Sequence, residues 1–281
     1  MRTRTGRATG RGTTGLPNQD AALARAPVFL VADGMGGHSW GRVASDAVVS
    51  AFDELADRLD PRGGSPVDED DVCRVIKDAA RAVRSELIWD IAEAWHHGKE
   101  FVAGSTVSGV ILTHENSEPD QHPEPPEPAE HRANPDHPAW LTLNVGDSRT
   151  YLLRDGVLTP LTRDHSHVQR LVDAGDLTRE EARRHPKRNI ITRAIGVGVR
   201  GGPDVTLVPA RVGDRVMACS DGAIEALSED DLATILTLDL EPLGIAKELV
   251  RRARRAGATD DVTVVVVDAR PEPSDDEEPG A

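Results

Sequence analysis

The sequence predicts an α+β fold in which mostly antiparallel β-sheet carries helices on its outer faces. Short runs rich in β-branched residues alternate along the chain with stretches of helical periodicity, and Gly, Asp or Pro bounds each run. The expected strands are residues 28–32, 106–112, 140–145, 151–153, 157–161, 215–219 and 262–268. Asp155 and Gly156 lie between two of these runs and predict a hairpin turn.

The helices are predicted from apolar residues that recur at spacings of three and four. This pattern runs through residues 39–59 and again through 72–91. Later helix starts are marked by a Ser or Thr with an acid three residues on, namely Thr178 with Glu181 and Ser228 with Asp231. The second pair matches less well, because a capping box prefers Glu or Gln. The last expected helix is 241–256.

Composition limits the function classes. The 281 residues suit one large domain or two small ones, and aromatic residues make up only 3% of them. The formal net charge of −15 repels nucleic acid, so we expect no nucleic-acid partner. Cys73 and Cys219 show no paired spacing, which disfavours a disulfide framework or a thiolate zinc site. No run approaches the roughly 18 apolar residues of a membrane helix, so we expect a cytoplasmic protein with no membrane contact.

Much of the negative charge is concentrated in two segments. Residues 114–138 contain seven acids, one Arg and seven prolines, and residues 271–281 contain five acids and no base. Such composition is typical of disordered, solvated chain. We expect a single domain over 1–270, with 114–138 as a loop inside it and 271–281 as an acidic tail, and we assign neither segment a catalytic role.

Four aspartates fall where the expected strands end or begin. Asp33, Asp147 and Asp221 each follow a strand, whereas Asp260 precedes one. If that last strand runs antiparallel to its neighbours, all four carboxylates meet at one rim of the sheet. Such carboxylates repel one another unless cations neutralise them, and oxygen ligands suit Mg²⁺ or Mn²⁺. The rim therefore predicts metal-assisted hydrolysis.

The alternative is structural. Asp-Gly is a common turn signal, so Asp33-Gly34 and Asp221-Gly222, taken singly, indicate turns as readily as ligands. Four solvated turns at one rim are compatible with the same pattern, and periodicity does not decide between the two interpretations.

Six motifs in order resemble one known family, the bacterial PPM-type, or type 2C, metal-dependent serine/threonine protein phosphatases. They are LPNQDA at 16–21, VADGMGGH at 31–38, GST at 104–106, NVGDSRTYLLRDG at 144–156, ACSDG at 218–222 and TDDVTVVVV at 259–267. Each motif is weak alone, but their order and spacing over residues 10–268 are specific.

The resemblance implies a four-layer α-β-β-α sandwich with two central, mostly antiparallel sheets. It also implies two Mn²⁺ or Mg²⁺ ions at the sheet edge, and a possible third. By similarity, Asp33 would bridge two metals, the Gly34 carbonyl would bind one, and Asp221 and Asp260 would complete the other's shell. A flap is expected at about 165–198. The remaining implied roles belong to Asp20, which would orient metal-bound water, and to Asp147 and Asn189, which would serve a third metal.

Several positions depart from the family pattern. Gly15 stands where many members carry a phosphate-binding Arg, and Arg11 is the nearest substitute, unless it is only a solvated basic residue. Asp261 replaces a usual Asn, and Arg42 replaces a Glu. His38 is interpreted as a helix-start residue rather than a catalytic acid, because Met35, not a His, follows the Asp33-Gly34 pair.

The sequence thus predicts a hydrolase that removes phosphate from phosphoserine and phosphothreonine through a metal-bridging water. The expected partners are phosphoproteins and a counteracting Ser/Thr kinase, and the expected state is a monomer. Two alternatives stay open. One is a non-catalytic regulatory domain that retains the fold, and the other is a phosphatase for a different phosphorylated substrate.

Overall fold

The computed structural model describes residues 1–13, 16–36, 39–62, 66–114, 138–197 and 201–272. The predictions for Gly15, His38 and most of the acidic loop lie outside these residues. The helices are α1 Trp40–Ala56, α2 Glu69–Glu86, α3 Ile88–His96, α4 His167–Asp173, α5 Arg179–Arg184, α6 Asp221–Ala226, α7 Glu229–Leu236 and α8 Pro242–Arg255.

All the paired strands are antiparallel, in two large sheets and one small one. One sheet has the order β11 (Asp204–Pro209), β7 (Pro138–Val145), β6 (Val107–His114), β3 (Val28–Ala32), β2 (Ala21–Arg25). The other has the order β1 (Arg2–Gly10), β13 (Val262–Arg270), β12 (Arg215–Cys219), β8 (Arg149–Arg154), β9 (Val157–Pro160). The small sheet has the order β10 (Ile195–Val197), β5 (Ala103–Ser105), β4 (Gly34–Gly36).

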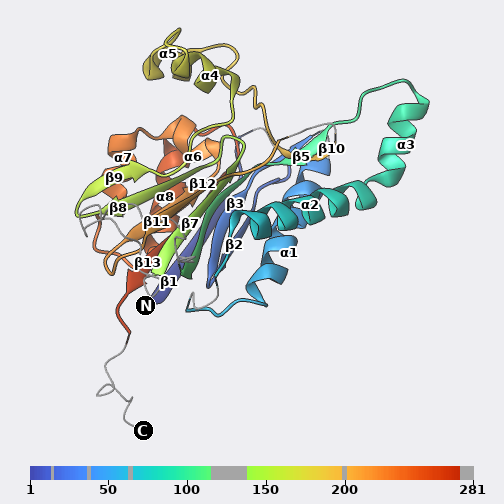
Figure 1. The fold of residues 1–281 in the computed structure, drawn as a ribbon. Coiled ribbons are helices and arrows are strands. Elements are labelled where there is room, and N and C mark those ends of the chain that lie inside the picture. Colours follow the sequence, from blue (N-terminus) through green and yellow to red (C-terminus); the bar gives the residue numbers. More distant parts are fainter. Residues whose placement is uncertain (14–15, 37–38, 63–65, 115–137, 198–200, 273–281) are drawn as a thin grey trace, which may run out of the picture.

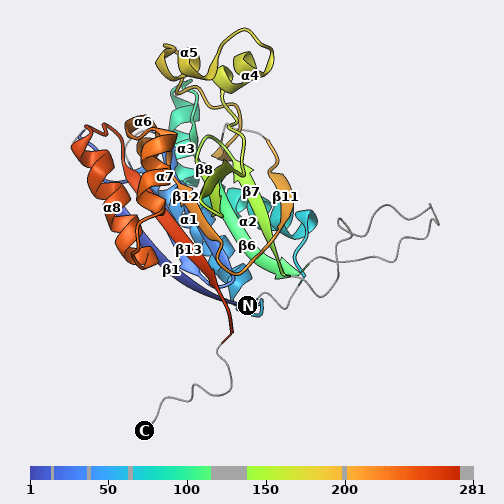
Figure 2. The ribbon, with the colours of Figure 1, turned by 90° about the vertical axis from the view of Figure 1, so that its left-hand side faces the viewer.

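The layers follow the α-β-β-α order, which confirms the predicted fold class. Figure 1 shows α6, α7 and α8 on one side of the stacked sheets and α1 and α2 on the other. Figure 2, turned by 90°, shows α8 lying along the sheet that contains β1 and β13.

Side-chain alternation in the strands builds three apolar layers. In β3, Val28 and Leu30 pack toward α1 and α2, whereas Phe29 and Val31 pack between the two sheets. In β13, Val264 and Val266 pack toward the helices around α8, and the intervening valines pack between the sheets. Both strands are buried on two faces, which explains why their sequences are continuous apolar runs.

Most predicted elements are found, with one correction and several omissions. The single helix expected over 72–91 is wrong, because the chain leaves helical geometry at Leu87 and continues as the separate helix α3. The structure also contains β1, β2, β4, β5, β10, β11, α4 and α6, which periodicity did not predict. The hairpin turn at Asp155-Gly156 is confirmed, and both residues have positive φ.

Both predicted capping boxes are present. Thr178 and Ser228 each accept a hydrogen bond from the backbone of the acid three residues on, and each acid side chain bonds back. Asp231 therefore closes a box despite being shorter than Glu. Among the described residues, no helix is both long enough and apolar enough to span a membrane.

Candidate metal centre at the sheet rim

The four predicted carboxylates sit at strand ends on one rim. Asp33 lies between β3 and β4, Asp147 follows β7, and Asp221 is the first residue of α6, directly after β12. Asp260 comes just before β13, which pairs antiparallel with β12 in the register Cys219 to Val264. The start of β13 therefore lies beside the end of β12, as the rim geometry requires.

Burial and mutual repulsion shape the electrostatics of this rim. Burial raises the pKa of Asp33 well above its ordinary value, and the charges of Asp20, Asp221, Asp147 and Asp260 raise it further. Burial likewise raises the pKa of Asp221, with further contributions from Asp147 and Asp260. The pKa of Asp147 is raised to about 7, mainly by burial. These carboxylates therefore share one electrostatic environment.

The rim offers one buried oxygen donor that has no hydrogen-bond partner among the described residues. Asp221 Oδ1 is buried and accepts no hydrogen bond within the described part of the chain. A buried carboxylate oxygen normally has a partner, so an unpaired one facing other acids fits a hard cation. Yet no three His, Cys, Asp or Glu side chains of the described residues lie close enough to hold an ion as they stand.

The Asp-Gly pairs of the rim differ from the hairpin pair in why they need glycine. A Cβ on Gly34 would lie 2.0 Å from the Gly41 carbonyl oxygen, and one on Gly222 would lie 2.2 Å from the Asp261 carbonyl oxygen. A Cβ on Gly156 would meet nothing within 4 Å, so that glycine serves only the turn. At the rim, glycine instead permits backbone from separate elements to approach closely.

Hydrogen bonds join three of the sequence motifs behind the rim. The Asp33 backbone N–H donates to Thr106 Oγ1 over 3.1 Å, and the Thr106 N–H donates to the Asp33 carbonyl over 2.9 Å. The Thr106 hydroxyl also bonds the Ser148 hydroxyl at 2.7 Å. Thr106 thus fixes the backbone of Asp33 against the segment that contains Asp147.

Asp20 is buried behind the rim. Burial raises its pKa to about 7, although hydrogen bonds from Thr263 and Ser220 lower it. Ser220 Oγ donates a hydrogen bond to Asp20 Oδ2 over 2.9 Å. Ser220 Oγ also accepts a hydrogen bond from the Thr263 N–H over 2.9 Å. Ser220 directly precedes Asp221, so one residue ties Asp20 to the strand end that holds a rim carboxylate.

Two departures from the family pattern have structural explanations. Asp261 accepts from the Gly12 N–H with one oxygen and from the Gln19 N–H with the other, both at 2.9 Å. Arg42 donates to the Asp20 carbonyl over 3.0 Å and pairs with Asp46 at 2.7 Å. Both residues therefore support the backbone next to Asp20.

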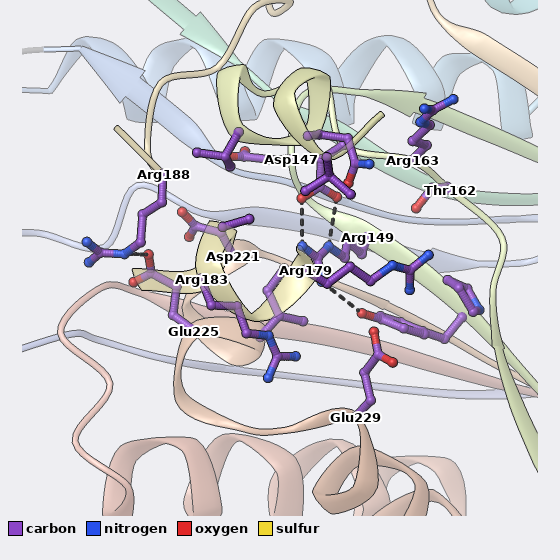
Figure 3. A pocket seen from close by; sticks show the side chains of 18 of the residues that line it. Asp147, Arg149, Thr162, Arg163, Arg179, Arg183, Arg188, Asp221, Glu225 and Glu229 are labelled. Carbon is purple, nitrogen blue, oxygen red and sulfur yellow. Dashed lines mark hydrogen bonds and ion pairs between the residues drawn. The ribbon is translucent and has the colours of Figure 1, made fainter. Parts of the chain in front are cut away.

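A cavity of about 1230 Å³ opens beside the rim, below the segment 165–197, which we call the flap. Asp147, Asp221 and Asn189 line it, so the structure brings Asn189 to the same cavity as two rim acids. Figure 3 shows these two acids in the cavity. Arg11 does not line it; its exposed guanidinium donates to the Leu16 carbonyl, with the shorter contact at 2.6 Å. Gly34 and Asp33 belong to the rim but not to this cavity.

Sequence reasoning missed Ser220, Glu225 and the role of Asp261. Glu225 lies one helical turn after Asp221 and raises the pKa of that residue. The four-residue spacing between Asp221 and Glu225 is the sequence feature that could have identified Glu225. The bonds of Ser220 and Asp261 join segments about 200 or more positions apart, so no local pattern indicates them.

Comparison with known proteins decides the family. The family model for protein phosphatase 2C matches residues 7–254. The chain belongs to the protein phosphatase 2C family. This confirms the predicted resemblance to PPM-type phosphatases.

Two of the relatives that the chain matches are bacterial phosphatases. The chain is 35% identical over 258 residues to the serine/threonine protein phosphatase PstP of Mycobacterium tuberculosis, covering 92% of this chain and 43% of that protein. It therefore spans less than half the length of that relative. It is also 30% identical to a serine/threonine phosphatase, stp, of Listeria monocytogenes, covering 86% of this chain and 84% of that one. A crystal structure of M. tuberculosis PstP superposes with a TM-score of 0.74 and 33% identity, covering 96% of this chain and 100% of that chain.

Proposed function

We propose that this chain hydrolyses phosphoserine and phosphothreonine in proteins, with two Mn²⁺ or Mg²⁺ ions as cofactors. The observation that carries the proposal is the rim itself, where the charges of Asp20, Asp147, Asp221 and Asp260 act on Asp33 and a buried Asp221 oxygen has no partner among the described residues. Family membership supports it, as does a catalytic-domain structure of PstP described as a complex with two manganese ions, 31% identical to this chain with a TM-score of 0.72.

The donor set fits such ions, because it is built from carboxylate and carbonyl oxygens. Asp33, the Gly34 carbonyl, Asp221 and Asp260 would hold two ions, and Asp147 with Asn189 would serve a third. Bound ions of this kind lower the pKa of a shared water and hold the oxygens of a phosphoryl group.

The remaining residues of the rim position these groups. Asp20 would orient water next to the rim, and its own orientation is set by the hydrogen bond from Ser220. Thr106 fixes the backbone of Asp33, so that its carboxylate projects from a strand end rather than from a mobile loop. Arg11 stays a candidate for contact with the substrate phosphate.

We further propose phosphoproteins as substrates, a Ser/Thr kinase that opposes this enzyme, and a monomeric state. Release of phosphate from serine and threonine in a signalling cycle requires a kinase that adds it. The counteracting kinase is thus a consequence of the proposed reaction.

The deciding experiment measures phosphate release from a phosphothreonine peptide by metal-stripped protein. We expect Mn²⁺ or Mg²⁺ to restore turnover when each ion is added back separately, with Ca²⁺ as the comparison ion. Binding of metal with no phosphate released from any phosphopeptide would favour the regulatory-domain alternative. Faster turnover of sugar phosphates than of the peptide would favour the other-substrate alternative.

A further inference from the structure

The cavity beside the rim has a basic wall. Besides Asp147 and Asp221, its lining includes four exposed or partly exposed arginines from the flap and from the segment that leads into it. These are Arg163, Arg179, Arg183 and Arg188. Figure 3 shows them gathered around the opening that also contains the two rim acids. A cavity of about 1230 Å³ is far larger than a phosphoryl group. It therefore has room for several substrate residues next to the phosphorylated one.

Two of these arginines are already neutralised by the protein. Arg163 pairs with Asp173, and Arg188 pairs with Glu225 at 3.3 Å. Each pair satisfies the guanidinium within the fold. These two residues therefore contribute little free positive charge to the cavity.

Arg179 and Arg183 differ from these two arginines. The guanidinium of each forms no ion pair or hydrogen bond with any residue that the structure describes. They lie four positions apart on α5, and so on the same side of that helix. The neighbouring Arg184 is also exposed, but it pairs with Glu180 at 3.2 Å and does not line the cavity. Helix α5 thus contributes Arg179 and Arg183 to the cavity lining together with Glu180, whose charge is paired with Arg184.

Acidic residues from α6 and α7 form another wall of the cavity. Glu229 and Asp230 belong to α7, and Glu225 belongs to α6, where it pairs with Arg188. A compact multivalent anion that filled the cavity would meet both walls at once. An extended peptide places successive side chains in opposite directions, so it can turn its acids toward α5 and its other residues toward α6 and α7.

We propose that Arg179 and Arg183 bind acidic side chains that flank the phosphoresidue of a protein substrate. The planar guanidinium donates paired hydrogen bonds to a carboxylate, which suits this role better than an ammonium group does. The proposal rests on the proposed phosphatase function and deepens it by assigning a substrate preference to α5.

The test compares three phosphothreonine peptides of equal length whose flanking residues are acidic, neutral or basic. The wild-type chain, the double variant Arg179→Glu/Arg183→Glu and the matched control Arg184→Glu are each loaded with Mn²⁺ and assayed for kcat/KM. We expect the double variant to lose about tenfold or more in kcat/KM on the acidic peptide, mainly through KM, because two attractions become repulsions. The neutral peptide should change by less than about twofold, and Arg184→Glu should leave all three values near wild type.

The readout is the ratio of kcat/KM for the acidic peptide to that for the neutral peptide. Rising ionic strength should reduce this ratio in the wild type, because added salt screens exposed charges. An unchanged ratio in the double variant would overturn the proposal, and so would an equal loss in Arg184→Glu. Failure of the proposed function gives a separate result, since the wild type would then release no phosphate from any peptide or from para-nitrophenyl phosphate.

Discussion

The rim and helix α5 face the same cavity but are built in opposite ways. Three rim acids, Asp33, Asp147 and Asp221, follow hydrogen-bonded strands and are half-buried, whereas Asp260, just before β13, is exposed. Helix α5 has six residues, of which only Ala182 is buried, and its arginines are exposed. The difference suggests that chemistry is assigned to groups fixed by the sheet, while recognition is assigned to side chains that can adapt.

The largest expected effect tests the rim. Asp221→Asn should lower turnover on a phosphothreonine peptide by about 10³-fold or more, because the substitution removes a charged oxygen aimed at the reaction centre. The variant should keep its fold, because it loses a buried charge that lies among like charges. Cooperative thermal unfolding of the variant would show this. Asp155→Asn is the matched control at a hairpin Asp-Gly, and its turnover should stay near wild type. Wild-type rates in Asp221→Asn would contradict the metal assignment.

A smaller effect is expected one layer behind the rim. Ser220→Ala removes the hydroxyl that orients Asp20 and leaves the Thr263 N–H without its acceptor. We expect turnover to fall by about 10- to 100-fold, which is typical for groups that orient a metal site. The apparent affinity for Mn²⁺, measured by titrating activity, should weaken in parallel. Equal kinetics for Ser220→Ala and for Ser85→Ala on the exposed face of α2 would argue against this role.

The pH dependence of stability sharpens the comparison further. Because burial raises the pKa values of Asp20 and Asp147 to about 7, the folded chain binds protons that the unfolded chain has released above pH 4. Stability of the metal-stripped protein should therefore fall as pH rises from about 4 through 7. We expect the Tm of the metal-stripped wild type to drop by about 5 °C or more between pH 5 and 8. The Tm of the Asp20→Asn variant should drop less over the same interval. A Tm that rises over this interval would show that the rim acids are not the dominant titrating groups.

The smallest effect is expected at the acidic loop. His114 and Pro138 are direct partners in the β6–β7 register, so a short turn can join these strands. Replacing residues 115–136 by such a turn should change kcat/KM on para-nitrophenyl phosphate by less than about twofold, because the composition of the loop gives it no catalytic group. A large loss in this assay would contradict the prediction.

The sequence predicted best those elements that are buried on both faces. The strands expected over 28–32 and 215–219 coincide with β3 and β12, because continuous apolar runs bounded by polar residues leave little choice of boundary. Strand β1 was missed because only Gly6 in it is buried, so it shows no apolar pattern, and its pairing with β13 defines it. The break at Leu87 was missed because the apolar spacing of three and four continues into α3.

For the site, too, some residues could be predicted from local sequence pattern and others could not. The rim aspartates could be located because strand ends and antiparallel pairing follow from local pattern. The bonds made by Asp261 and Ser220, and the inward placement of Arg179 and Arg183, depend on elements far apart in the chain. Such contacts follow only from the tertiary fold.

The pairing of β1 with β13 has a consequence for how the molecule is made. Residue by residue, Arg2 to Gly10 pairs with Arg270 to Val262, so β1 is synthesised long before the strand with which it pairs. Asp33 and Asp260 are likewise separated by most of the chain. A nascent chain on the ribosome therefore has an unpaired edge on this sheet and an incomplete rim until β13 has been synthesised, and contacts this distant in sequence form slowly. The proposed activity should therefore arise in one step, once β13 is in place, rather than gradually during translation.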